Sequence, residues 1–500
     1  MVGDETVWFG IHPKHSIVKA GAWAGAANFG SALLSLAGTI ILSRMLSPAD
    51  IGLFSVAFTF YSIPSMVIGP GLTAAAVQAP NLTPQQSSNL LWINVAVNAA
   101  LASILVAVAP ALAEWYHQPA LRMLCNAFAF VLVLEGFATQ YRALLTRAMR
   151  FDLAAKIGIT VGSASLVVAV VLAWFGLGAW ALAMQAIVGA VADRIALATV
   201  VSWRPSWFDR RTSVRDVLHF SAGSSLTLAM HMLYTQSQSL LMGRCGSVSD
   251  VGFYGRGQAL FQKPFSQVIG PLHAVLLPAL SARQRDPDHL GTAVYRANAV
   301  LYTLLPPVAI WMMISGSDIA GTLLGRGWEP AGQALFWFAL AAIPGILFGT
   351  LYKSNDAIGR PAWGLGIRAL FLPMLLAGLV WAAPRGAAAM AAVGAAVEWA
   401  SAPVILWLLL KESPVPHRFY VQAMGECIAT ISLTMLAMWP MQALLEQLGL
   451  PVMARASLSL IGCFVAALLI ARLFPFGRTA WLEGAALARR RFQRTGMKPA

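Results

Sequence analysis

The sequence predicts an all-α integral membrane protein of about 14 transmembrane helices, arranged as two pseudo-symmetric six-helix bundles plus two C-terminal helices. Three observations predict this fold class. The chain is 58% hydrophobic and only 11% charged, whereas soluble domains contain about 25% charged residues. It contains a series of apolar stretches, each long enough to cross a bilayer. A motif that begins at Arg44 also recurs 200 residues later.

A helix needs about 20 mainly apolar residues to cross the hydrocarbon core. Fourteen stretches meet this requirement, at residues 20–43, 51–72, 90–113, 121–144, 153–175, 178–201, 217–243, 253–280, 291–315, 331–352, 362–383, 387–410, 419–440 and 454–475. Thr83-Pro84 gives the third stretch an N-cap followed by a first-turn proline. Gly176-Leu-Gly178 predicts a tight turn between the fifth and sixth.

The distribution of basic residues predicts that both termini are cytoplasmic. With the N-terminus inside, the inner segments carry 25 of the 34 lysines and arginines, and the outer segments carry 7. Cytoplasmic loops are enriched in these residues. The net charge of +14 is therefore mostly cytoplasmic and suits an anionic inner leaflet. Membrane lipids are therefore expected partners. No nucleic-acid partner is expected, because a basic tail such as Arg489-Arg490-Arg491 more often fixes the topology of a membrane protein.

The repeated motif indicates an internal duplication. Its two copies share five positions at an offset of 200, which are Arg44/Arg244, Ser47/Ser247, Asp50/Asp250, Gly52/Gly252 and Pro64/Pro264. Six predicted helices separate the copies, so both halves have the same orientation, related by a pseudo-twofold axis along the membrane normal.

This duplication defines the predicted domains. Residues 1–201 form the first six-helix bundle, and residues 217–410 form the second. The segment 202–216, which mixes aromatic and basic residues, is a cytoplasmic interfacial linker. Residues 411–475 add two helices, and 476–500 are a basic cytoplasmic tail.

Polar faces on two equivalent helices predict a central cavity. The seventh predicted helix carries Thr227, His231, Tyr234, Thr235 and Gln238 on one stripe. Because polar groups facing hydrocarbon are costly, this stripe should face protein or water. The first helix has a milder stripe, formed by Asn28, Ser31, Ser35 and Thr39. For the first helix, a cavity wall and helix-packing contacts remain equal alternatives; for the seventh, the cavity is favoured.

The eighth predicted helix adds two cations, Arg256 and Lys263, which share one face because they lie seven residues apart. One interpretation is that Arg256 extends to the membrane surface and Lys263 simply adjoins Pro264. For Arg256 the favoured interpretation is a cationic cavity wall for a phosphate-bearing substrate, since arginine offers bidentate recognition. For Lys263 both interpretations stay open. The predicted substrate-binding residues are thus Arg256, Lys263, His231, Tyr234, Gln238, Asn28, Ser31 and Ser35.

Several other charged residues and prolines are predicted to have either a structural or a functional role. Arg44, Asp50, Arg244 and Asp250 flank the outer turns after the first and seventh helices, where they would cap the next helix or form an outer gate. Pro64 and Pro264 predict bends that permit rocking. Glu135 and Glu398 are candidate proton carriers, or satisfy a neighbouring helix. Asp193 adjoins Arg194, which predicts local charge compensation.

No enzyme is predicted. The sequence contains no P-loop, no nucleophile triad and no acidic metal motif of the kind that glycosyltransferases use, and its histidines do not form a metal-ligand pattern. We therefore expect no cofactor and no metal. The four cysteines lie in or beside apolar runs, so no structural disulfide is expected. No cleaved signal peptide is expected either, because Asp4 and Glu5 are not followed by a short apolar region with a cleavage site.

A series of short motifs follows one order from the first predicted helix to the start of the tenth. They are Leu42-Ser-Arg44-Met-Leu-Ser-Pro-Ala-Asp50-Ile-Gly52, Trp92-Ile-Asn94, Arg142-Ala-Leu-Leu-Thr-Arg147, Gly243-Arg244, Gly252-Phe-Tyr254-Gly-Arg256, Leu277-Pro-Ala-Leu-Ser281 with Asp286-Pro287, and Leu324-Gly-Arg-Gly-Trp328-Glu-Pro330-Ala. In these motifs the chain resembles the polysaccharide transporter (Wzx-type flippase) family of the multidrug/oligosaccharidyl-lipid/polysaccharide (MOP) exporter superfamily.

The resemblance implies a flippase of the bacterial inner (cytoplasmic) membrane. Its substrate would be an oligosaccharide repeat linked to undecaprenyl diphosphate, destined for exopolysaccharide, capsule or O-antigen. A polysaccharide polymerase and a chain-length regulator would be partners. The chain departs from the family where acids are common, at the loop after the second helix and at Gln238.

Two other functions fit the sequence less well. A cation-coupled, MATE-like multidrug antiporter of the same superfamily is the alternative, but it requires an acid deep in a cavity helix. The first, seventh and eighth helices offer none. A membrane scaffold or polymerase subunit is less favoured, because the outer loops are short.

Overall fold

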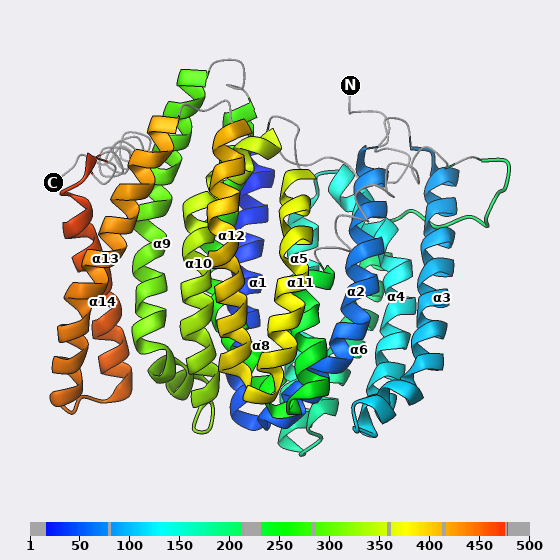
Figure 1. The fold of residues 1–500 in the computed structure, drawn as a ribbon. Coiled ribbons are helices and arrows are strands. Elements are labelled where there is room, and N and C mark those ends of the chain that lie inside the picture. Colours follow the sequence, from blue (N-terminus) through cyan, green and yellow to red (C-terminus); the bar gives the residue numbers. More distant parts are fainter. Residues whose placement is uncertain are drawn as a thin grey trace, which may run out of the picture. The chain divides into compact units, whose positions relative to one another are not determined.

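The computed structural model describes residues 17–78, 82–212, 214, 232–281, 287–357, 362–412, 417–475 and 478. Within these residues the chain is almost entirely helical, with short turns between helices (Figure 1). The helices are α1 Ile17–Met45, α2 Pro48–Gln78, α3 Pro84–Trp115, α4 Ala120–Arg147, α5 Phe151–Trp174, α6 Ala179–Val200, α8 Val248–Ser281, α9 Pro287–Leu324, α10 Glu329–Ala357, α11 Ala362–Ala382, α12 Ala387–Glu412, α13 His417–Gln447 and α14 Val452–Ala471. The part of α7 that the structure describes spans residues 232–245.

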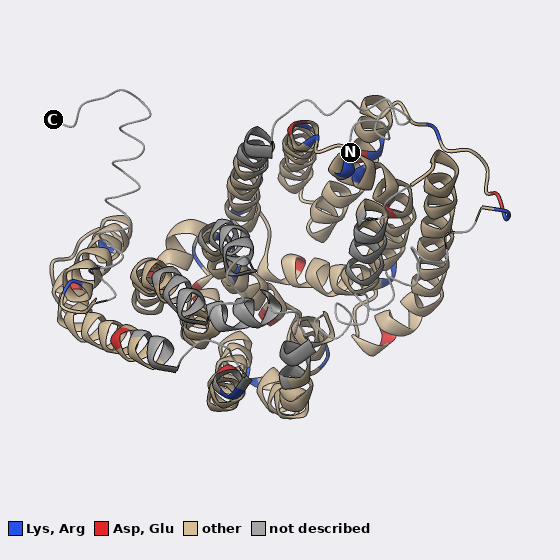
Figure 2. Cartoon of the chain, turned by 90° about the horizontal axis from the view of Figure 1, so that it is seen from above, with Lys and Arg blue, Asp and Glu red and all other residues tan. Residues whose placement is uncertain are grey.

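The predicted fold class is confirmed, because the chain is an all-helical membrane protein of 14 helices. Among the described residues, nine helices are long and apolar enough to cross a membrane. Charged positions are sparse over the helices (Figure 2), as the low charged fraction of the sequence requires.

Most helices extend past the predicted spans. The sequence predicts a span at 291–315, whereas α9 runs from Pro287 to Leu324 and has a non-helical residue at Ser315. The apolar pattern marks only the part of a helix that crosses hydrocarbon, while the helical hydrogen bonds continue into the polar boundary. Most of the predicted seventh span lies outside the described residues.

Two turn predictions agree with the structure. Thr83 is the N-cap of α3, and it forms a capping box with Gln86, with Pro84 in the first turn. Gly176 and Gly178 have φ angles of 76° and 54°, a region that glycine enters without steric cost. The turn between α5 and α6 therefore depends on these two glycines.

The chain forms two compact units. The first comprises residues 1–256 and 379–386, and the second comprises residues 257–378 and 387–500. In the first unit, α4 packs against α2, α3 and α6, while α5 packs against α1 and α6. A cluster of buried side chains, including Leu91, Leu144 and Trp203, lies among these helices. The domain boundaries predicted from the repeat stay a prediction.

In the second unit, α9 packs against α10, α13 and α14, and α10 packs against α12. The phenol of Tyr302 donates to the Leu347 carbonyl oxygen at 2.7 Å, which joins α9 to α10. Arg455 of α14 pairs with both carboxylate oxygens of Asp318 in α9, at 2.6 and 2.5 Å. Bidentate pairing of this kind fixes orientation as well as distance.

Candidate functional site

The two copies of the repeated motif adopt the same local structure. Ser47 Oγ donates to Asp50 Oδ2 at 2.6 Å, and the Asp50 backbone N–H donates to Ser47 Oγ at 3.1 Å. The corresponding distances between Ser247 and Asp250 are 2.6 and 3.0 Å. Both α2 and α8 therefore begin with a side-chain cap that satisfies N-terminal backbone donors.

The same two aspartates also face the start of a second helix. Asp50 Oδ1 accepts a hydrogen bond from the Ala179 backbone N–H, at the start of α6, at 3.2 Å. A Cβ on Gly386, directly before α12, would lie 3.1 Å from Asp250 Oδ1. Each acid thus lies beside two helix N-termini, where negative charge is favourable. The capping role is visible in this geometry, and the gating role stays a proposal.

Gly52 and Gly252 bring the first turns of α2 and α8 into backbone contact, which we call the glycine crossing. A Cβ on Gly52 would lie 1.7 Å from the Val248 carbonyl oxygen. A Cβ on Gly252 would lie 2.1 Å from the Pro48 carbonyl oxygen. Real Cβ contacts are never this short, so neither position admits a side chain unless the helices separate. Small residues permit such close approach between membrane helices.

Arg256, in the third turn of α8, is partly buried. Its Nε atom is inaccessible, and among the described residues its guanidinium has no hydrogen-bond or ion-pair partner. By contrast, Arg194 and Arg455, which also lie within helices, each pair with a carboxylate. Gln238, on α7, likewise has a buried Oε1 without a partner among the described residues.

Lys263 lies in a groove of about 530 Å³ in the second unit. The groove is bounded by α8 and α10, and its lining is mainly apolar, with Phe261, Phe265 and Ile346 among the lining residues. The polar side chains of Lys263 and Gln262 line it as well. The groove therefore combines apolar walls with a cation on one helix.

The remaining predicted cavity residues occupy different environments. Asn28, Ser31 and Ser35 are exposed along α1, and Tyr234 is partly buried on α7. His231 lies outside the described residues. The helices α2 and α8 continue without interruption past Pro64 and Pro264, so the predicted bends stay a prediction. Glu398 is partly buried in α12.

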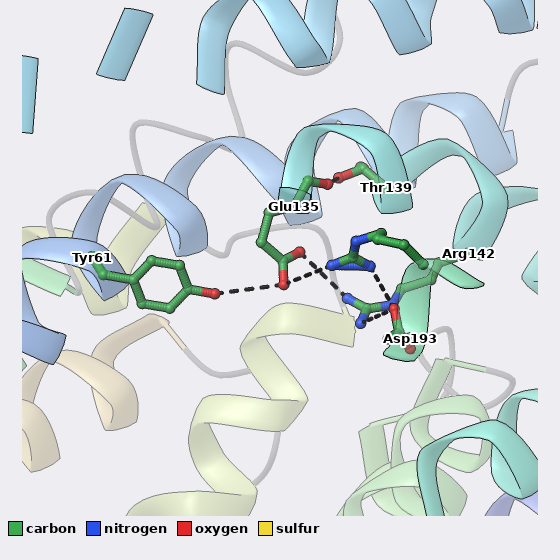
Figure 3. A network of polar contacts seen from close by, with 6 residues as sticks. Tyr61, Glu135, Thr139, Arg142 and Asp193 are labelled. Carbon is green, nitrogen blue, oxygen red and sulfur yellow. Dashed lines mark hydrogen bonds and ion pairs between the residues drawn. The ribbon is translucent and has the colours of Figure 1, made fainter. Parts of the chain in front are cut away.

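A charged network inside the first unit was not predicted as a whole. Glu135 on α4 lies 3.5 Å from Arg142 and 3.3 Å from Arg194, and the hydroxyl of Tyr61 donates to it at 3.5 Å (Figure 3). Asp193 accepts from Arg142 at 2.9 Å and pairs with Arg194 at 2.5 Å. The network thus joins α2, α4 and α6 with two positive and two negative charges.

One part of the network was visible in the sequence, and the rest was not. The neighbours Asp193 and Arg194 indicate local compensation, and this pair is present. Glu135 and Arg142 are seven residues apart, a spacing that places both on one face of a helix. That spacing was a signal for their contact, but only the packing of α4 against α6 brings the two pairs together.

The comparisons with known proteins agree with this architecture. The family described as "Polysaccharide biosynthesis protein" matches residues 41–333, which is more than half of the chain. The chain belongs to this family. The family predicted from the sequence motifs is thereby confirmed.

Two curated relatives carry names that refer to polysaccharide biosynthesis. The chain is 26% identical over 322 residues to the succinoglycan biosynthesis transport protein ExoT of Rhizobium meliloti (strain 1021), across 63% of this chain and 65% of that one. It is 20% identical over 322 residues to the lipopolysaccharide biosynthesis protein WzxC of Escherichia coli (strain K12), with the same coverage. The chain thus spans about 65% of the length of these relatives.

Solved structures show the fold of this family member. A lipid II flippase, MurJ, in an inward closed conformation matches with a TM-score of 0.65 and 11% identity, covering 90% of this chain and 98% of that one. An inward-facing multidrug resistance MATE transporter of the MOP superfamily matches with a TM-score of 0.60 and 15% identity, covering 77% and 96%. The chain therefore has the MOP fold and is a multi-pass membrane protein. The orientation of its termini stays a prediction.

Proposed function

We propose that the chain is a flippase that moves undecaprenyl-diphosphate-linked oligosaccharide repeats across the bacterial inner membrane by alternating access. The product would serve exopolysaccharide, capsule or O-antigen assembly. The names of the relatives support a role in polysaccharide export, and the MOP fold supports transport. The observation that carries the proposal is Arg256, a guanidinium without a counterion among the described residues.

An unpaired guanidinium within an apolar helix is costly unless water or an anion accompanies it. A diphosphate would supply that anion, because its oxygens match the fixed donor geometry of arginine. Arg256 would therefore bind the charged part of the substrate within a cationic central cavity. No acid among the described residues competes for it, so the substrate would not have to displace a salt bridge.

Lys263 and its groove would bind the next part of an amphiphilic substrate. A diphosphate linked to a polyprenyl chain has an anionic head and an apolar tail. The groove offers a cation beside Phe261 and Phe265. The polar side chains of the first and seventh helices would face the sugars, and we keep Asn28, Ser31, Ser35, His231, Tyr234 and Gln238 as proposed contacts.

The repeated motif would form the outer gate. The glycine crossing and the caps at Asp50 and Asp250 join the outer ends of α2 and α8. In alternating access, the two halves separate on one side of the membrane at a time. Contact through bare backbone allows tight closure and leaves no side chains to disengage on opening. Arg44 and Arg244, which are exposed beside this point, would contribute to the same gate.

Energy coupling is proposed at Glu135 or Glu398. A proton on Glu135 would weaken its pairing with Arg142 and Arg194, and it would thereby loosen α4 from α6. A cation-coupled drug antiporter has no comparable support, since the likeness to MATE structures shows only the fold and the prominent unpaired group on α8 is basic.

The test is export in a strain that lacks the gene and any paralogue. Arg256→Ala should reduce export about 10- to 100-fold, as expected for loss of one or two charge-assisted hydrogen bonds. Lipid-linked repeats should accumulate on the inner leaflet. The matched control is Arg385→Ala, which removes an exposed arginine that stacks on Trp381 in an outer turn. Equal losses in the two variants at matched expression would remove Arg256 from the binding site.

A further inference from the structure

The segment Trp203–Thr212, which we call the strap, is bound tightly to the first three turns of α3. Asn89 is 1% exposed and uses its whole amide. Its Nδ2 donates to the carbonyl oxygens of Asp209 and Thr212 at 2.7 and 2.9 Å, and its Oδ1 accepts from the Asp209 backbone N–H at 2.9 Å. A buried amide with this many partners fixes the strap in one register, because each lost bond would leave a polar group unsatisfied.

Further contacts hold the middle of the strap. Gln85 Nε2 donates to the Trp207 carbonyl oxygen at 2.9 Å, and Trp92 Nε1 donates to the Ser206 carbonyl oxygen at 2.9 Å. The rings of Trp92 and Trp207 stack with centroids 5.5 Å apart and planes 3° apart. Ser206 Oγ donates to Gln85 Oε1 at 2.6 Å. The strap is therefore a rigid part of the first unit.

This rigid segment displays aromatic and basic side chains outward. Trp207 is 84% exposed and Phe208 is 48% exposed. Arg210 and Arg211 are exposed and have no hydrogen-bond or ion-pair partner through their side chains among the described residues. The one acid of the strap, Asp209, is occupied within its own turn, where it accepts from the Arg211 backbone N–H and the Thr212 hydroxyl.

The strap also lies where lipid headgroups would be. It follows the end of α6 in the chain and is hydrogen-bonded to the start of α3, so it lies at the end of these helices that is predicted to be cytoplasmic. Figure 1 shows it extending beyond α3 at the rim of the first unit. Farther along α3, Ile104, Val106 and Val108 are exposed, as expected of a helix that faces lipid. Aromatic residues are enriched at this depth of a membrane.

We propose that the strap is a binding surface for anionic phospholipid headgroups of the inner leaflet. Trp207 and Phe208 insert at the level of the glycerol backbones, and Arg210 and Arg211 bind the headgroup phosphates. Charge complementarity selects this partner over a neutral lipid, because the strap carries three arginines and one aspartate. Asn89 and Trp92 are positioning residues, which hold the arginines at the membrane surface without touching lipid.

The test uses the full-length chain in nanodiscs of phosphatidylcholine, with or without phosphatidylglycerol. Bound lipid is counted by native mass spectrometry. Contact of Trp207 with lipid is measured as quenching of tryptophan fluorescence by brominated lipid, and the Trp207→Ser variant gives the fluorescence of the other tryptophans. The wild type should prefer phosphatidylglycerol, and Arg210→Gln/Arg211→Gln should lower that preference about 25-fold, since each basic residue near an anionic surface contributes about fivefold. Asn89→Ala should reduce the preference although both arginines remain.

Arg385→Gln is the matched control and should leave lipid preference unchanged. This arginine lies in the turn between α11 and α12, at the end of the helices opposite to the strap. Every variant is checked for a monodisperse size-exclusion profile, and the Arg210/Arg211 variant changes only exposed side chains. Equal quenching of Trp207 fluorescence by brominated phosphatidylcholine and brominated phosphatidylglycerol would overturn the proposal. Quenching by aqueous acrylamide alone would overturn it as well, because that result is expected for a surface that binds a soluble protein. The test does not measure transport, so it can fail while the proposed function stands.

Discussion

Gly52→Ala is the sharpest test of the proposed outer gate. The new Cβ would lie 1.7 Å from the Val248 carbonyl oxygen, whereas ordinary contact begins at 3.4 Å. The two helix ends would therefore have to separate by about 1.7 Å. Neither side can yield locally, because both contacting groups belong to helix backbone.

The added Cβ raises the free energy only of the state in which α2 and α8 touch. Overpacking of this kind costs about 1–3 kcal/mol. If the gate opens during transport, the substitution shifts the population toward the open state by roughly 5- to 150-fold. Transport should fall, since a gate that does not close interrupts alternating access.

The assay is thiol labelling from outside the cell in a cysteine-free background. Ser55, one turn deeper in α2, lies 3.8 Å from the position of a Cβ on Gly255 of α8, so Ser55→Cys reports separation of these helices. Gly52→Ala should raise its labelling rate at least about fivefold, by the same population shift. Gly252→Ala is the symmetric variant.

Gly158→Ala on α5 is the control, because nothing lies within 4 Å of its Cβ. It should leave labelling unchanged and favour the helix by up to about 1 kcal/mol. Wild-type labelling and transport in well-expressed Gly52→Ala and Gly252→Ala would refute the reasoning.

Three further predictions follow from polar contacts. Glu135→Gln should lower the free energy of unfolding by about 2–4 kcal/mol, because it leaves Arg142 and Arg194 with one carboxylate fewer. The loss is smaller than for a fully buried pair because Arg142 is half exposed. An unchanged thermal melt would contradict this. Asp318→Asn should destabilise the packing of α14 on α9 by about 1–3 kcal/mol, because it removes the bidentate partner of Arg455; hydrogen exchange confined to α14 would show it. The pKa of Asp209 lies below its ordinary value, because the Arg211 backbone N–H and the Thr212 hydroxyl donate to its carboxylate. The strap is therefore stabilised above the unfolded pKa of this carboxyl and loses that stability as the pH falls through the folded value. Proteolysis of the strap should increase over that acidic range, and Asp209→Asn should abolish the pH dependence.

Local signals predicted the helices and their ends well. The apolar runs placed thirteen of the spans within the helices described here or within a few residues of their ends, and Thr83 and Gly178 marked turns that the structure contains. These features depend on neighbours in the sequence, and a pattern of neighbours is visible without a fold. Asp50 was a candidate for capping its own helix for the same reason.

Contacts between distant segments were beyond the sequence. Asn89 and Trp92 gave no sign that they would bind a strap more than 110 residues later. The sequence allows Glu135 to carry a proton or to satisfy a neighbouring helix, but it does not name the two arginines with which Glu135 pairs. A single chain does not reveal which helix faces are adjacent, because apolar faces of similar size can pack in many arrangements.

The sequence by itself determined the membrane class, the helices, the internal repeat and the family resemblance, because each is encoded in composition, periodicity or local motifs. Only the tertiary structure decided that Gly52 and Gly252 face each other's helix, that Arg256 lacks a partner among the described residues, and that Asn89 holds the strap. The physical reason is that close packing selects one set of neighbours among many that the apolar pattern permits.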